Sequence, residues 1–439
     1  MLEKLRNIFQ VPELRRRILF TLGLFAVYRL GEHLPTPGVN AAALAGAFRS
    51  QANTLFGLYD MFVGGAFSRA TVFALGIMPY ISASIILQLL GAVVPYFEKL
   101  RKEGEEGQKK ITQYTRYGTV FISIVQSYAY SIFLVNLGAA QGLSVVPNPG
   151  FAFYFATIIT QVTGTILVMW LGEKITEYGI GNGISLIIFV NILGGVPNRV
   201  MQAIDSARGG SVTVLQVVLV LAIMVAVIAA VVIMTQAVRK IPVQYAKRMV
   251  GRRMYGGQST HIPLRVNTAG VIPIIFASSI MILPTTVAGF VPPDHPLAQV
   301  AQWFNPLGAL YNTLYGVIIV FFTYFYTAVV LNPNDLAENM RKYGGFIPGI
   351  RPGKKTAEYI DRVLSRITLP GAIFLALVAV LPDIMIAWFK VPAVGFGGTS
   401  VLIVVGVALD TLQQIESHLL MRHYEGFITR GRIRGRQRM

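Results

Sequence analysis

The chain has 439 residues, of which 54% are hydrophobic and only 13% are charged, and its formal net charge is +18. A soluble domain carries roughly 25% charged residues, so this composition excludes an ordinary soluble enzyme or binding domain. The sequence contains no cysteine, which also excludes disulfides, thiolate metal ligands and a cysteine nucleophile.

The apolar residues gather in runs that are long enough to cross a membrane. A helix of about 20 residues spans the hydrocarbon layer, and only internally bonded backbone is tolerated there, so these runs predict helices. The fifth run is short, and the tenth carries Asp410, Gln413, Gln414 and Glu416 in its inner half. In chain order the ten predicted spans are residues 18–34, 72–94, 119–141, 151–172, 181–195, 213–238, 271–291, 308–331, 369–389 and 399–420.

The first span follows three arginines, Arg15, Arg16 and Arg17. No small-residue cleavage site follows this run closely, so we expect a retained helix rather than a signal peptide.

Basic residues alternate strongly between the two sets of connecting segments. The termini and every second loop hold 32 lysines and arginines, whereas the intervening loops hold 5. Cytoplasmic loops carry the excess of basic residues, so both termini are predicted to be cytoplasmic, which requires an even number of spans.

Two segments repeat each other. Residues 76–86 and 270–280 open the second and seventh spans, and six of their eleven positions are identical, including a glycine and a proline. A weaker similarity links residues 183–188 with 398–403. Five spans separate the copies, which predicts two five-helix halves of opposite orientation, residues 1–200 and 201–439. The alternative is a pair of proline-kinked helices without shared ancestry.

The spans offer little to a coupled transporter or an enzyme. Spans two, three, four, six, seven and eight contain no Asp, Glu, Lys, Arg or His, and span nine contains only Asp383, toward its outer end, although coupled transporters usually bury ionisable residues. No His-Glu-x-x-His is present, and residues 349–356 lack the spacing of a phosphate loop. We therefore expect a passive channel, with no cofactor or metal, whose energy comes from a partner. A small-solute permease with an inverted repeat, or a structural scaffold, would be the alternatives.

Several long strings resemble the signatures of the SecY family: residues 60–69 and 74–81, 179–185, 251–257, 269–273 and 345–353. The resemblance implies an all-α membrane protein whose two inverted five-helix halves form an hourglass channel. Such a channel passes unfolded secretory polypeptides across the bacterial cytoplasmic (inner) membrane. It also releases membrane-protein segments into the lipid bilayer through a lateral gate between spans two, three, seven and eight. The resemblance further implies SecE and SecG as membrane partners, and the SecA ATPase or the ribosome on the cytoplasmic side.

The same resemblance assigns roles to apolar and polar residues of the spans. It implies a hydrophobic pore constriction made of Ile77, Ile81, Ile188, Ile275 and Ile403, which on sequence alone would be read as core or lipid-facing residues. Gln88 lies seven residues after Ile81 and Asn267 eight residues before Ile275, so both amides are expected at a similar depth. The resemblance favours a polar latch between them across the closed gate, whereas the plainer reading is a local hydrogen bond in each helix.

Residues 57–68 are too short to span a membrane and lie on the outer side. On sequence alone they read as a surface helix. The resemblance implies a plug, with Phe62 and Val63 buried and Gly64 and Gly65 allowing close backbone approach. We expect this segment to bond to no spanning helix, so that its deletion preserves folding.

Two cytoplasmic loops, residues 239–266 and 332–366, hold seven basic residues each. Gly256 and Gly257 lie between two mixed stretches of the first loop, which predicts a projecting hairpin. A basic protrusion suits ribosomal RNA phosphates or an acidic motor surface. Arg252, Arg253 and Arg351 are the candidate contact residues.

Overall fold

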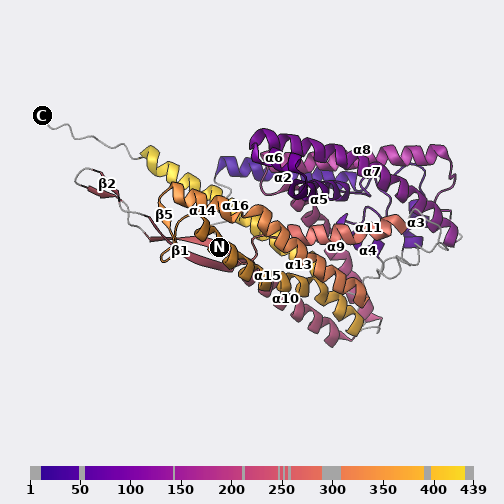
Figure 1. The fold of residues 1–439 in the computed structure, drawn as a ribbon. Helices are drawn as coiled ribbons and strands as arrows, with labels where there is room; N and C mark the ends of the chain where they lie inside the picture. Colours follow the sequence, from indigo (N-terminus) through magenta and orange to yellow (C-terminus); the bar gives the residue numbers. More distant parts are fainter. Residues whose placement is uncertain are drawn as a thin grey trace. The chain divides into compact units, whose positions relative to one another are not determined.

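The computed structural model describes residues 11–48, 55–141, 144–209, 213–245, 248–250, 253–255, 259–288, 308–389 and 397–430. The chain divides into two compact units (Figure 1). Unit 1 comprises Met1–Ala52, Phe56–Gly195 and Val407–Met439, and unit 2 comprises Asn53–Leu55 and Val196–Gly406. The last part of the chain thus belongs to the first unit.

Unit 1 is built of helices. The helices α7 and α8 lie side by side, and α5 packs on α7. Two short helices, α3 and α4, precede α5, which bends at Val94 into α6 by 97°. The bounds are α2 (Pro12–Gly31), α3 (Ala41–Phe48), α4 (Leu55–Phe62), α5 (Met78–Val93), α6 (Pro95–Lys102), α7 (Glu105–Gln141), α8 (Phe151–Tyr178) and the first part of α9 (Gly183–Arg208).

Unit 2 combines helices with a small sheet. The helices α13 and α15 lie side by side, and α11 packs on α13. The three-stranded sheet has the order β4-β1-β5. The bounds are α10 (Val214–Gln236), β1 (Val238–Tyr245), β2 (Arg248–Val250), β3 (Arg253–Tyr255), β4 (Ser259–Arg265), α11 (Ile272–Ala288), α13 (Ala309–Val330), α14 (Pro333–Lys342), β5 (Gly345–Phe346), α15 (Lys354–Phe389) and the first part of α16 (Gly398–Arg430), whose remainder from Val407 belongs to unit 1.

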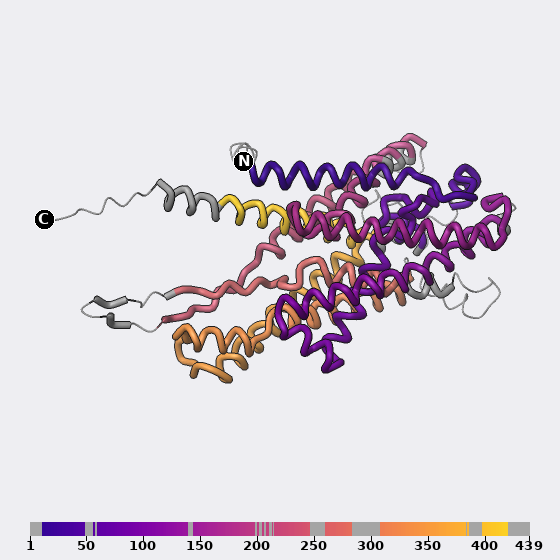
Figure 2. The backbone as a smooth tube through the Cα atoms, turned by 90° about the horizontal axis from the view of Figure 1, so that it is seen from above, coloured from indigo at the N-terminus to yellow at the C-terminus, as the bar shows by residue number. Residues whose placement is uncertain are grey.

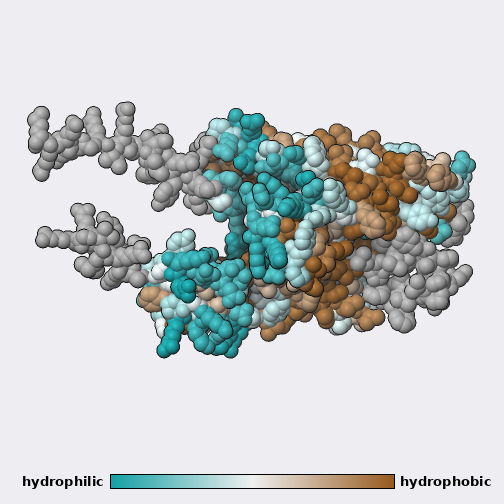
Figure 3. Space-filling model, turned by 45° about the horizontal axis from the view of Figure 1, so that its top comes forward, coloured by the Kyte–Doolittle hydropathy of each residue, from teal (hydrophilic) through white to brown (hydrophobic). Residues whose placement is uncertain are grey.

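Each of the ten predicted spans coincides with one helix of the described chain: α2, α5, α7, α8, α9, α10, α11, α13, α15 and α16. Six helices in these ranges are long and apolar enough to cross a membrane alone, and the bent pair α5–α6 makes a seventh. The apolar parts of α9 and α11, Gly183–Pro197 and Ile272–Ile282, are shorter. Brown hydrophobic surface is gathered apart from teal hydrophilic surface in Figure 3, as expected for a protein that meets both lipid and water.

The hairpin predicted in the first basic loop is present. The strands β1 and β4 pair antiparallel from Val238 with Arg265 to Gln244 with Ser259, and they run beside each other in Figure 2. The strands β2 and β3 keep the same register, since Val250 pairs with Arg253. The reversal therefore lies between Val250 and Arg253, so the two glycines that led to the prediction, Gly256 and Gly257, do not form the turn. Both glycines lie outside the described residues. Its base packs on α14 and α15 through an apolar cluster, whose fully buried members are Ile241, Val243, Leu264, Met340, Ile347, Ile360 and Leu364.

The repeated segments adopt the same local conformation in their two units. Gly76 and Gly270 both have positive φ, of 53° and 64°. The helices α5 and α11 begin two residues later, each with proline as its second residue. Proline there loses no helical hydrogen bond, so neither proline is a mid-helix kink. This shared start supports a duplication over two unrelated kinked helices.

Candidate functional site

All five isoleucines assigned to the constriction are buried, with exposed fractions from 0% for Ile403 to 6% for Ile275. Unit 1 contributes Ile77, Ile81 and Ile188, and unit 2 contributes Ile275 and Ile403. This burial removes the reading of these residues as lipid-facing, and the ring itself stays a prediction.

Four of these isoleucines share one local design. Each comes five residues after a glycine at or just before the start of its helix: Gly76 and Ile81, Gly183 and Ile188, Gly270 and Ile275, Gly398 and Ile403. The same number of residues thus separates glycine and isoleucine at the starts of α5, α9, α11 and α16. In α9 and α16, where the glycine is the first helical residue, this spacing is about 7.5 Å along the helix.

Two of the four glycines are fixed by close packing. A side chain at Gly183 would overlap the carbonyl oxygen of Gly172 in α8, and one at Gly398 would overlap that of Val378 in α15. In each unit, the helix that carries the isoleucine therefore starts directly against the backbone of the preceding helix. Sequence reasoning noted the similarity of residues 183–188 and 398–403 but not this shared contact.

The predicted plug begins as a helix and continues as a series of turns. Helix α4 ends at Phe62, and the turns run from Val63 to Ile77. Phe62 and Val63 are buried, with 5% and 1% exposure. Val63 packs against Gly76, because a side chain at Gly76 would meet its Cγ1 atom. The segment thus lies against the turn before α5, at the residue that precedes Ile77.

An aromatic cluster surrounds Phe67 in the middle of the segment. Its ring lies 4.7 Å from that of Tyr130 and 5.0 Å from that of Tyr59, measured between centroids. Tyr59 also donates a hydrogen bond of 3.0 Å to the carbonyl of Leu75, and burial raises the pKa of its phenol, so the hydroxyl stays protonated. The cluster anchors the segment by apolar contact as well as by hydrogen bonds.

The expectation that this segment bonds to no spanning helix is wrong. The hydroxyl of Tyr130 in α7 donates to the carbonyl of Phe67 at 2.8 Å. The side-chain amide of Asn191 in α9 donates to the carbonyl of Phe62 at 2.9 Å. The backbone of a turn has carbonyls that no helix or sheet satisfies, and here the spanning helices satisfy them. Deletion of residues 57–68 would therefore cost stability.

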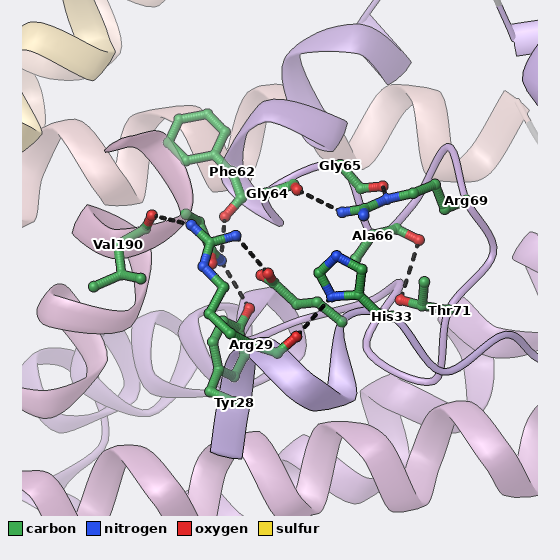
Figure 4. A network of polar contacts seen from close by, with 12 residues as sticks. Tyr28, Arg29, His33, Phe62, Gly64, Gly65, Ala66, Arg69, Thr71 and Val190 are labelled. Carbon is green, nitrogen blue, oxygen red and sulfur yellow. Dashed lines mark hydrogen bonds and ion pairs between the residues drawn. The ribbon is translucent and has the colours of Figure 1, made fainter. Parts of the chain in front are cut away.

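A polar network joins this segment to α2 and α9 (Figure 4). Arg29 pairs with Glu32 at 2.6 Å and donates to the carbonyl of Val190 at 2.7 Å. The amide of Asn191 donates to Tyr28 at 2.8 Å as well as to Phe62. The Glu32 side chain is fully buried, although charged groups are rarely buried without a function or a partner.

Arg69 closes the other side of the turn. It donates to the carbonyl of Gly65 at 2.8 Å and to that of Gly64 at 3.0 Å. Arg29 and Glu32 lie near the end of the first predicted span, residues 18–34, and sequence reasoning did not single out Asn191. A polar residue inside a short apolar run was the available signal, because an amide in a membrane needs a partner.

The two candidate latch residues each make a local hydrogen bond. Gln88 donates to the hydroxyl of Ser84, one turn earlier in α5, at 3.0 Å. Asn267 donates to the carbonyl of Gly270 at 3.2 Å, and its side-chain oxygen is buried without a hydrogen-bond partner among the described residues. The local bonds agree with the plainer reading, and the latch stays a prediction.

The basic candidates differ in how far they are described. Arg351 is exposed in the turn before α15, between Gly349 and Gly353, which both have positive φ. Its carbonyl accepts a hydrogen bond from the Thr356 hydroxyl at 2.9 Å, which stabilises the turn. Arg253 begins strand β3, and Arg252 lies outside the described residues.

Solved structures share this fold. One SecY structure aligns with a TM-score of 0.65 and 17% identity, over 92% of each chain. It is described for a plug domain that stabilises the closed state of the translocation channel and maintains a membrane seal. Sec61 in a canine ribosome-channel complex aligns with a TM-score of 0.61 and 17% identity, over 92% of this chain and 93% of that chain. The predicted class, an all-α membrane channel protein, is thereby confirmed.

Sequence comparison is more specific. The protein translocase subunit SecY of Escherichia coli (strain K12) is 48% identical over 96% of both chains. That of Aquifex aeolicus (strain VF5) is 46% identical over 98% of this chain and 100% of the relative. The sequence profile of the SecY family matches residues 71–412, a range that includes all the isoleucines assigned to the constriction. The chain belongs to the SecY family and is a multi-pass membrane protein.

Proposed function

We infer that this chain is a protein-conducting translocation channel, a function that follows from its membership of the SecY family. The observation that carries the inference is the match over nearly the whole chain to protein translocase subunits.

The constriction is proposed to be a ring of Ile77, Ile81, Ile188, Ile275 and Ile403. A narrow apolar ring excludes water and ions when it is empty, yet it can widen around a polypeptide. The burial of all five side chains and the shared glycine-to-isoleucine spacing in four helices support this role. Unfolded secretory polypeptides would pass through the ring.

The ring can be tested by removing its bulk on both units at once. Ile81→Gly combined with Ile275→Gly should raise the ion conductance of idle reconstituted channels, because the wider constriction would fill with water. Single-channel recordings like those of the parent would reject the ring. Ile360→Gly, which empties the cluster at the base of the hairpin instead, serves as the control for general destabilisation.

Residues 57–68 are proposed to be the plug of the idle channel. A plug domain is described for the related SecY structure, and here Val63 packs against Gly76, the residue before Ile77. Gln88 and Asn267 are proposed to form a polar latch of the lateral gate, through which membrane-protein segments would leave sideways into the lipid bilayer. The buried side-chain oxygen of Asn267, which has no hydrogen-bond partner among the described residues, supports a second partner for this residue.

The energy for transport is proposed to come from partners, so that this chain is no enzyme. Sec61 and the yeast Ssh1 complex are described in complex with ribosomes. For this chain we propose the ribosome or the SecA ATPase at the hairpin and at Arg351, with SecE and SecG as membrane subunits. The exposure of Arg351 and the basic hairpin strands support such contacts with RNA phosphates or acidic surfaces.

The channel is proposed to lie in the bacterial cytoplasmic membrane with both termini in the cytoplasm. The excess of 32 over 5 basic residues on alternate segments supports this orientation. A small-solute permease would need a compact site of convergent polar groups. The candidate residues at mid-depth are isoleucines, so no specific observation favours that function.

A further inference from the structure

Polar side chains of unit 1 enclose one glycine of the segment proposed as the plug. A side chain at Gly64 would lie 2.8 Å from Oε1 of Glu32 and 3.2 Å from Oδ1 of Asn191. Gly64 also has a φ of 67°, which other residues rarely adopt. The turn thus touches the carboxylate and the amide with its bare backbone.

The enclosing side chains are themselves held in place from two helices. Arg29 bridges α2 to α9 by pairing with Glu32 and donating to the carbonyl of Val190. Its guanidinium occupies the space that a side chain at Gly194 would need, one turn after Val190. Asn191 uses both of its amide hydrogens, one toward Tyr28 and one toward Phe62.

We propose that Arg29, Glu32 and Asn191 form a polar clasp that holds residues 62–69 in the resting position and sets how often the idle channel opens. The proposal rests on the proposed function of this segment as a plug. On this view the three residues are positioning residues, because they act on the pore only through the segment that they hold.

The chemistry of the clasp suits a part that must release. Hydrogen bonds in a dry, low-dielectric site are strong, but water can replace them at little net cost. Apolar packing would lose its full free energy of burial on opening, whatever the water content. A clasp of polar groups therefore holds while the site is dry and weakens as soon as a translocating chain admits water.

Two features argue against a purely structural role for these residues. An apolar side chain of similar size would fill the site of Glu32 without the cost of burying a charge. Moreover, Oε1 of Glu32 and Oδ1 of Asn191, the two atoms that face Gly64, are buried without hydrogen-bond partners among the described residues. Unsatisfied buried acceptors at the contact keep the held state from being too stable.

The absence of cysteine from the chain provides a direct test. Val63→Cys places a unique thiol at a position that is 1% exposed, so a membrane-impermeant maleimide added from the outer side reacts only when the segment leaves. Labelling is measured in membranes, with the partner subunits present, in idle channels and in channels that hold a stalled secretory chain. The Val63→Cys parent should be labelled slowly when idle and rapidly when engaged.

Glu32→Gln and Asn191→Ala are each added to the Val63→Cys parent. In the idle channel, each should raise the labelling rate of the introduced thiol by about ten- to hundredfold, because a buried or charge-assisted hydrogen bond is lost. Gly64→Ala should do the same while leaving the clasp side chains intact, which covers the case that the first variants fold poorly. Glu173→Gln is the matched control, because it breaks an Arg116–Glu173 ion pair of 2.8 Å in the same unit without touching the segment. Its labelling rate should equal that of the parent.

The outcomes separate the clasp from the plug. If the engaged parent is labelled no faster than the idle parent, the segment is not a plug and the proposed function fails at this point. If engagement speeds the labelling but Glu32→Gln, Asn191→Ala and Gly64→Ala all label at the parent's idle rate, the plug stands and the clasp is overturned. If Glu173→Gln speeds labelling as much as these variants, the effect is general loosening, and the clasp is likewise rejected.

Discussion

Replacing Gly183 by alanine should displace helix α9 and widen the idle pore. The added carbon would overlap the carbonyl oxygen of Gly172 and would lie 2.8 Å from Cβ of Ile175. Both neighbours are rigid, since one is backbone and the other is the first carbon of a fully packed side chain. Neither can turn away as the end of a long side chain could, so the start of α9 itself must move.

The size of the displacement follows from the contact distances. Ordinary contact begins at 3.4 Å, so the Ile175 contact alone requires a shift of about 0.6 Å, and the carbonyl of Gly172 requires more. Such overpacking typically costs about 1–3 kcal/mol. The gain in helix propensity from alanine is at most about 1 kcal/mol, so the substitution should destabilise the protein.

The functional effect should appear at Ile188, which lies five residues further along the same helix. A shift at the start of a rigid helix carries over about one and a half turns, so Ile188 should move away from its resting place. We expect a higher ion conductance of idle reconstituted channels, together with a lower melting temperature. Gly91→Ala in α5 is the matched control, because no atom beyond its own helix backbone and chain neighbours lies within 4 Å of the added carbon.

Gly398, the corresponding glycine of α16, allows a second test of the same packing effect. Gly398→Ala should behave like Gly183→Ala, because its added carbon would overlap the Val378 carbonyl oxygen. Gly398 also precedes Ile403 by five residues, as Gly183 precedes Ile188. A Gly183→Ala protein with the parent's conductance and melting temperature would show that α9 tolerates the extra carbon. The packing argument for both glycines would then be refuted.

Three further predictions concern the motor contact, the gate and the plug anchor. Arg351→Glu should reduce SecA-driven translocation into proteoliposomes by at least ten- to hundredfold, the effect of losing about 1.5–3 kcal/mol of binding free energy. Arg351→Lys should retain part of the activity, because only a guanidinium makes two parallel hydrogen bonds. Protein abundance should not change, and a normal translocation rate for Arg351→Glu would reject this role. Gln88→Leu combined with Asn267→Leu should lower the free energy of opening the gate by about 1 kcal/mol, so that substrates with weaker signal sequences are transported. Unchanged selectivity in the same translocation assay would argue for purely local hydrogen bonds. Tyr130→Phe should leave the Phe67 carbonyl without its 2.8 Å hydrogen bond and lower the stability of the protein by about 1–3 kcal/mol. The effect should be measured as a lower melting temperature and a higher ion conductance of the idle channel. An unaltered melting curve would contradict the anchoring role.

The helices themselves could be predicted because lipid imposes a simple rule on sequence. An apolar run of sufficient length must satisfy its own backbone, so each of the ten runs coincides with a helix. Helix ends were harder to predict. Helix α7 begins at Glu105, well before the predicted span at residue 119, because a helix can continue into water with charged residues that hydropathy ignores. Helix α5 begins only at Met78, because the residues before it form the turns that follow α4.

The candidate site was predicted in parts. The constriction isoleucines and the plug came from family signatures, since an isoleucine has no feature of its own that separates pore from core. The independence of the plug from the spanning helices was predicted wrongly. Its bonds come from Tyr130 and Asn191, and carbonyls in a turn leave no trace in the sequence of the helices that satisfy them.

The sequence by itself determined the class, the positions of the ten helices, the charge asymmetry and the repeated segment, because these depend on composition, run length and local identity. Only the tertiary structure decided which groups meet. Asn191 and Phe62 are 129 residues apart, and Asn191 and Tyr28 are 163 residues apart, yet each pair is joined by a hydrogen bond. Hydrogen bonds require donor and acceptor to approach within about 3 Å at a favourable angle. That condition is met by the packing of α2, α4 and α9, and no pattern along the chain encodes it in readable form.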